Sequence, residues 1–75
     1  MTRTDFIRQY EQELIMRYTW ACDNNKRERF LASVLTTLGT NDKTWNHDGD
    51  AVTAAWRALG GKRKPTLKAL RALPV

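Results

Sequence analysis

The spacing of the apolar side chains most constrains the fold of this 75-residue chain, because it is helical in every apolar segment of useful length. No run alternates apolar and polar residues for long enough to form a strand. A chain of this length makes at most one domain and buries only about 60% of its unfolded surface. The sequence therefore predicts a single all-α domain, residues 1–75, built as a compact bundle of three to four helices.

A first helix is predicted over about residues 4–22. Thr2 and Asp5 have the spacing of a capping box, in which each side chain accepts a hydrogen bond from the other residue's backbone N–H. An apolar stripe then recurs at every fourth position and consists of Phe6, Tyr10, Leu14 and Tyr18. The polar run at residues 23–25 ends this helix.

A second helix is predicted over residues 25–38, where Asn25 and Glu28 form a start signal and Gly39 a stop. One face of this helix carries Phe30, Leu31, Val34, Leu35 and Leu38. Residues 39–49 lose the helical period and are rich in Asn, Asp, Thr and Gly. We therefore expect a loop from which Trp45 folds back over the core.

Two shorter helices are predicted in the C-terminal third. Asp50 can cap a helix over residues 50–59, which Gly60 stops. Its apolar face holds Val52, Ala55, Trp56 and Leu59. Pro65 suits the first turn of a helix over residues 65–73, where its missing N–H costs nothing. The apolar face of that helix holds Leu67, Leu70 and Leu73.

Charge is unevenly distributed along the chain. The last 25 residues hold six basic side chains and no acidic one, whereas the first 50 hold seven basic and eight acidic side chains. The formal net charge of +5 is thus the sum of −1 and +6. A block of one sign on a folded element is expected for a polyanion partner, because each neutralised phosphate releases condensed counterions. A solvated, solubilising surface would give the same pattern.

Residues 54–70 resemble the helix-turn-helix of small DNA-binding proteins. A helix with an alanine-rich inner face ends in Leu-Gly, and a turn leads into a second helix that opens on Thr-Leu. The turn is about one residue longer than usual, and Gly61 stands where the motif has a buried aliphatic residue. An ordinary antiparallel helical hairpin with a glycine-rich turn gives a similar sequence.

The resemblance implies that the second helix lies in the major groove, with Lys64, Thr66, Lys68 and Arg71 as groove and phosphate contacts. Lys62 and Arg63, in the turn, would meet backbone phosphates. The predicted nucleic-acid-binding residues are therefore Lys62, Arg63, Lys64, Thr66, Lys68 and Arg71, with DNA favoured over RNA as the partner.

The whole chain also resembles short, functionally uncharacterised proteins of temperate phages and prophages of enteric bacteria, through residues 13–15, 30–34, 54–60 and 65–73. This resemblance implies a bacterial cytosol and a small regulatory or accessory protein. The N-terminus carries charges where a signal peptide has its apolar region, and no run is long enough for a membrane span. We therefore expect a cytoplasmic location and no membrane partner.

An alternative function is a helical adaptor or inhibitor that docks on a host protein, with an aromatic hot spot formed by Phe6, Tyr10 and Trp20. The short chain also leaves a homodimer open. Trp20, Trp45 and Trp56 could form a stacking platform for single-stranded nucleic acid, although Trp56 lies on an apolar stripe that favours core packing.

Catalytic chemistry, metals and cofactors are not indicated. His47 is the only histidine and has too few neighbours for zinc or a catalytic triad. Asn46, Asp48 and Asp50 lack the glycine position and closing glutamate of a calcium loop. Cys22 is the only cysteine, which excludes an internal disulfide, and we expect it to be an inert, half-buried thiol.

Overall fold

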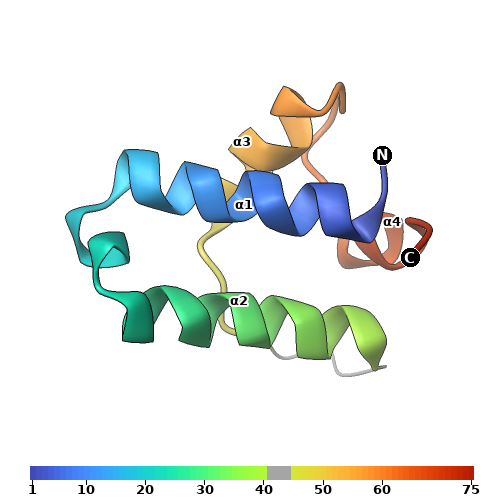
Figure 1. Cartoon of the computed structure of the whole chain (residues 1–75). Coiled ribbons are helices and arrows are strands. Elements are labelled where there is room, and N and C mark those ends of the chain that lie inside the picture. Colours follow the sequence, from blue (N-terminus) through green and yellow to red (C-terminus); the bar gives the residue numbers. More distant parts are fainter. Residues whose placement is uncertain (41–44) are drawn as a thin grey trace.

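The computed structural model describes residues 1–40 and 45–75 and folds them into four α-helices and one 3₁₀ turn, with no strand in these two ranges. The elements are α1 (Arg3–Arg17), η1 (Thr19–Cys22), α2 (Asn24–Gly39), α3 (Gly49–Ala58) and α4 (Leu67–Arg71). In Figure 1, α1 and α2 run antiparallel, and α4 lies near the N-terminus and the end of α2. The predicted all-α class is confirmed.

Polar side chains begin each helix. The predicted capping box is present, since Thr2 Oγ1 accepts from the Asp5 N–H at 3.1 Å and Asp5 Oδ2 accepts from the Thr2 N–H at 3.2 Å. The predictions that Asn25 and Asp50 cap the next two helices are wrong. Asp23 caps α2 and Asp48 caps α3, because in each case the aspartate two residues earlier accepts from the first-turn N–H groups.

The first helix ends five residues earlier than the predicted Cys22. Tyr18 has extended backbone angles, and Thr19–Cys22 form the 3₁₀ turn. This change of direction lets the Tyr18 hydroxyl donate to Asp48 Oδ1 at 2.9 Å. It also places the Trp20 ring between Tyr18 and Phe30, with ring centroids 5.4 and 5.0 Å away.

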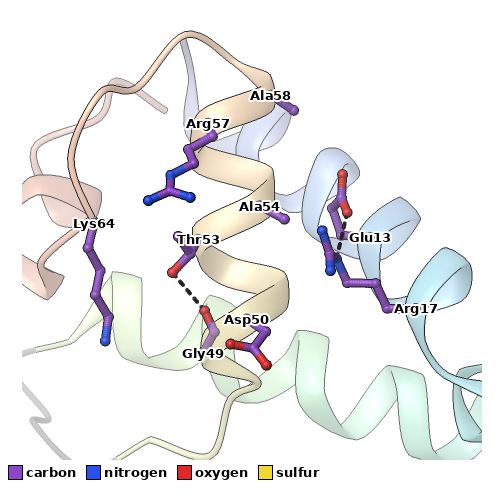
Figure 2. A pocket seen from close by; sticks show the side chains of 9 residues that line it. All are labelled: Glu13, Arg17, Gly49, Asp50, Thr53, Ala54, Arg57, Ala58 and Lys64. Carbon is purple, nitrogen blue, oxygen red and sulfur yellow. Dashed lines mark hydrogen bonds and ion pairs between the residues drawn. The ribbon is translucent and has the colours of Figure 1, made fainter.

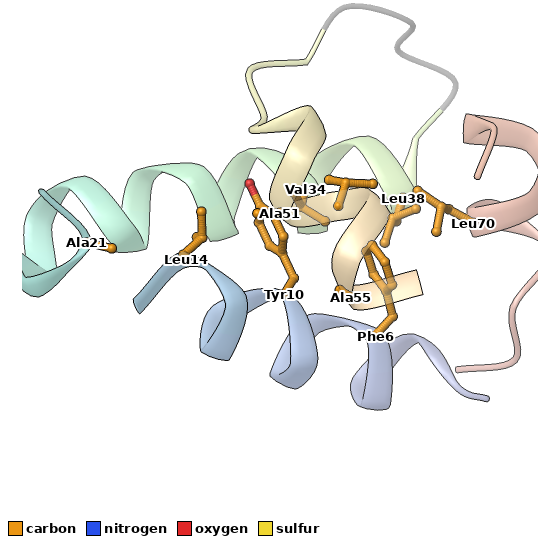
Figure 3. Close-up of a cluster of buried hydrophobic side chains, with 10 residues drawn as sticks. Phe6, Tyr10, Leu14, Ala21, Val34, Leu38, Ala51, Ala55 and Leu70 are labelled. Atoms are coloured by element: carbon orange, nitrogen blue, oxygen red, sulfur yellow. The ribbon is translucent and has the colours of Figure 1, made fainter. Parts of the chain in front are cut away.

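The core draws on every element, as Figure 3 shows. Its buried apolar members are Phe6, Tyr10, Leu14, Ala21, Val34, Leu38, Ala51, Val52, Ala55 and Leu70. The small alanines of α3 let it pack closely against α1. Trp45, Trp56 and Leu59 are partly buried against this cluster, as predicted. The rest of the predicted loop, residues 41–44, lies outside the described part of the chain.

The predicted apolar stripe of α2 is wrong at Leu35, whose side chain is 56% exposed. Val34 and Leu38, four residues apart, face the core, and at 3.6 residues per turn Leu35 is rotated away from it. Ile15, beside the stripe of α1, is also exposed.

The last helix is shorter than the predicted 65–73. The hydroxyl of Thr66 accepts from the Ala69 N–H at 3.1 Å, so α4 begins after Thr66 and not at Pro65. Leu70 anchors α4 in the core, and α4 packs against α2.

Candidate nucleic-acid interface

A glycine turn fixes where the basic segment leaves α3. Gly60 has a φ of +97°, its N–H donates to the Arg57 carbonyl at 3.0 Å, and the Gly61 N–H donates to the Trp56 carbonyl at 2.9 Å. This pair of bonds is a Schellman motif, in which the positive φ favours glycine. A Cβ atom on Gly61 would overlap the Trp56 indole. The indole therefore fills the space where a helix-turn-helix has an aliphatic residue.

Four of the six predicted site residues are exposed cations. Lys62, Arg63 and Lys64 follow the Schellman turn, and Lys68 lies on α4. None of their side chains forms a hydrogen bond or ion pair with any residue that the structure describes. These four side chains are accessible to a partner.

The other two predicted residues are built into the fold. The Thr66 hydroxyl oxygen caps α4 with one of its two lone pairs, which leaves its proton to donate and one lone pair to accept. Arg71 is partly buried, and its Nε donates to the Thr37 carbonyl at the C-terminal end of α2 at 3.1 Å. Its own carbonyl accepts from Arg3 Nη2 at 2.6 Å. We assign Arg71 to the packing of α4 on α2 and α1.

The structure adds Arg57, which was outside the predicted set. Arg57 is exposed on α3, and Figure 2 shows it on the same side of the helix as Lys64 and Thr53. They belong to the lining of an open hollow of about 670 Å³ along α3, which Glu13 and Arg17 of α1 also line. The signal in the sequence was its place in the acid-free block that begins at Ala51.

The acidic side chains of the first fifty residues are mostly engaged within the fold. Three of them cap helices: Asp5, Asp23 and Asp48. Two form ion pairs, Glu11 with Arg27 at 3.4 Å and Glu13 with Arg17 at 3.0 Å. Asp50 and the paired Glu13 are the acids that line the hollow beside Arg57. The positive charge near residues 57–68 is therefore only partly offset.

Two tyrosine hydroxyls meet at the start of α3. The Asp48 N–H donates to the Tyr10 hydroxyl at 3.1 Å, while the Tyr18 hydroxyl donates to the Asp48 carboxylate. Burial raises the pKa of Tyr10 from 10.0 to about 12. The hydrogen bond to Asp48 raises the pKa of Tyr18. Both phenols are therefore neutral, structural groups at physiological pH.

The three tryptophans do not form a shared stacking platform. Trp20 lies between Tyr18 and Phe30, and Trp56 packs against Gly61. Trp45 stacks on His47, with centroids 3.8 Å apart. Each indole already packs against a neighbouring residue on at least one side, so the three rings do not form one surface on which bases could stack.

Residues 1–40 and 45–75 contain no group of three metal-ligating side chains. In the same ranges, no helix has both the length and the apolar character needed to cross a bilayer. Cys22 is exposed, which corrects the expectation of a half-buried thiol. It lies on η1, where the turn that seats Trp20 leaves it at the surface.

No family model, curated protein or solved structure is detectably similar to this chain.

Proposed function

We propose that this protein binds nucleic acid, DNA before RNA, chiefly through the phosphate backbone. The observation that carries the proposal is a set of five exposed cations on residues 57–68 whose side chains have no partner among the described residues. The set consists of Arg57, Lys62, Arg63, Lys64 and Lys68. Because these side chains form no hydrogen bond or ion pair within the described fold, phosphates can pair with them without breaking an existing interaction.

Only a small part of the helix-turn-helix resemblance supports this proposal. The helix that would enter the groove, α4, has five residues, and it offers Lys68 and the Thr66 hydroxyl proton. DNA sequence is read by side chains that contact base edges, so these two groups can distinguish only a few bases. We therefore propose weak sequence preference and, from the phage resemblance, a small regulatory or accessory role in a bacterial cytosol.

Neutralising the loop tests the proposal. The triple variant K62Q/R63Q/K64Q removes three cations whose side chains form no hydrogen bond or ion pair with a described residue. Binding of a labelled DNA duplex, followed by fluorescence anisotropy across a salt series, should weaken. The slope of log K against log salt should fall by up to about 2.7, at about 0.9 per phosphate contact.

The matched control is R8Q/K26Q/R29Q. These three cations are also exposed and without a described partner, but they lie on α1 and α2. The control removes the same net charge, so a general field effect would weaken both variants equally. Equal losses, or no binding by the parent protein at low salt, would refute an interface at residues 57–68.

The alternative function is docking on a host protein, and the surface that the sequence suggested for it is not exposed. Phe6 and Tyr10 are fully buried between α1 and α3, so they cannot form an exposed hot spot with Trp20. Any protein partner has to use a different surface.

A further inference from the structure

An apolar groove whose lining includes none of residues 57–68 lies between the first half of α1 and the last half of α2. Its apolar lining consists of Ile7, Leu35, Leu38 and Val75. Its volume is about 330 Å³, at the lower end of the range for small-molecule pockets.

The groove exposes apolar surface that this fold could have hidden. Leu35 is 56% exposed and Val75 is 94% exposed, although a chain of this size has few large apolar residues to spare. Within the described part of the chain, α3 and α4 cover other faces of α1 and α2. Apolar side chains gathered around a concave surface mark a binding site more often than scattered ones do.

Both charged side chains of the groove are arginines, Arg3 and Arg8. Arg8 is exposed and its guanidinium has no partner among the described residues. Arg3 donates through Nη2 to the Arg71 carbonyl, but its buried Nε has no hydrogen-bond partner in the described structure. The groove therefore combines an apolar floor with two cationic side chains, of which Arg8 is exposed and unpaired among the described residues, and no acidic side chain lines it.

This charge pattern decides between possible occupants. A second copy of the chain would bring the same two arginines and a further net charge of +5, so like charges would face each other. A segment with apolar side chains and flanking carboxylates would instead complement both features. A helix is the natural shape for it, because a groove between two helices accepts a third by ridge packing.

We infer that the groove between α1 and α2 docks an acidic amphipathic helix of a partner protein. Apolar side chains one turn apart on that helix contact Leu35, Ile7 and Val75, and its carboxylates pair with Arg8 and Arg3. This inference is independent of the proposed nucleic-acid binding, which uses residues 57–68 on another part of the surface.

A displayed library of helical peptides, about 15 residues long so that isolated helices can form, tests this inference. The full chain is the bait, with the library randomised at both apolar and charged positions. Selected ligands should carry Leu, Ile or Phe at i and i+4 with flanking Asp or Glu. NMR shift changes on adding a selected peptide should centre on Ile7, Leu35 and Val75.

Three variants locate the binding. Leu35→Glu and Arg8→Glu alter exposed side chains of the groove and should each weaken the selected peptide at least about tenfold. Met16→Glu is the control, because Met16 is 71% exposed and lies outside the groove. Changing the peptide's carboxylates to lysines should restore affinity for Arg8→Glu relative to the parent protein.

Several results would overturn the inference. These are the absence of any selected ligand, basic ligands, shift changes away from the groove, or an equal effect of Met16→Glu. Self-association of the parent chain that Leu35→Glu abolishes would assign the groove to a second copy instead. Displacement of the peptide by duplex DNA that persists in K62Q/R63Q/K64Q would assign it to nucleic acid.

Discussion

The start of α3 and the segment that follows α3 use charge in opposite ways. At the start, the Asp48 carboxylate accepts from the Ala51 N–H and the Tyr18 hydroxyl, so the charge is consumed by local structure. After the end, Lys62, Arg63 and Lys64 extend from a glycine turn with no described partner. Charge near the folded framework therefore contributes to stability here, whereas charge on the turn is available to a ligand. Five measurements test this difference.

The largest expected effect is in the core beside α3. Phe6→Ala should lower the free energy of unfolding by about 3 to 5 kcal/mol, because Phe6 is fully buried. Leu35→Ala should cost less than about 1 kcal/mol, since that side chain is largely exposed. Urea denaturation followed by circular dichroism measures both. A larger loss for Leu35→Ala would mean that the groove is filled by the chain itself.

Removing the Asp48 carboxylate should destabilise the domain next most. Asp48→Ala loses the helix cap and the acceptor for Tyr18, which together should cost about 2 to 4 kcal/mol. Asp50→Ala is the matched control, because Asp50 is exposed in the first turn of the same helix without a described partner. Similar melting temperatures for the two variants would contradict the assignment of Asp48 as the cap.

Alkaline pH should weaken the same region. The folded pKa of Tyr10 is about 12 against an ordinary 10.0, so its neutral form stabilises the fold fully below pH 10. That stability, about 2 to 3 kcal/mol, is lost as the pH rises through about 12. The free energy of unfolding, measured from pH 9 upward, should fall less steeply with pH for Tyr10→Phe, because phenylalanine cannot ionise. Parallel curves would show that Tyr10 is not responsible.

The glycine turn should tolerate no side chain at Gly61. Gly61→Ala forces a Cβ atom into the Trp56 indole and should cost about 1 to 3 kcal/mol. Gly39→Ala provides the control, because nothing lies near its added Cβ and its φ is not positive. We expect Gly39→Ala to leave thermal stability unchanged or slightly raised. An unchanged melting temperature for Gly61→Ala would show that the turn can shift.

The smallest expected effect on stability belongs to the basic segment. K62Q/R63Q/K64Q should keep the free energy of unfolding within about 0.5 kcal/mol of the parent, because these exposed side chains form no hydrogen bond or ion pair with a described residue. Thermal unfolding at low and physiological salt measures this. A clear loss of stability would mean that these cations support the fold, as the Asp48 carboxylate does.

Local signals in the sequence were enough to predict the four helices and the Thr2 capping box. They could not predict where α1 ends, because Tyr18 leaves the helix to reach Asp48, thirty residues later. The exposure of Leu35 was missed for a similar reason. Which part of an apolar stripe faces the core depends on where the neighbouring helices pack, and spacing within one helix does not contain that information.

The candidate interface divides in the same way. Exposure of Lys62, Arg63 and Lys64 follows from the glycines just before them, a local feature. Arg71 looked equivalent in the sequence, but it donates to the Thr37 carbonyl, 34 residues earlier in the chain. No composition or spacing rule distinguishes a cation that closes a helix end from one that reaches solvent.

The hydrogen bond from the Arg3 N–H to the Pro74 carbonyl, 2.8 Å long, joins the two ends of the described structure. The packing of α1 against α3 likewise joins segments that lie far apart in the sequence. Phe6, Tyr10 and Leu14 share one core with Ala51, Val52 and Ala55 of α3. Folding of this domain is therefore expected to require closure of a loop that joins Arg3 to Pro74, which is slower than formation of the separate helices.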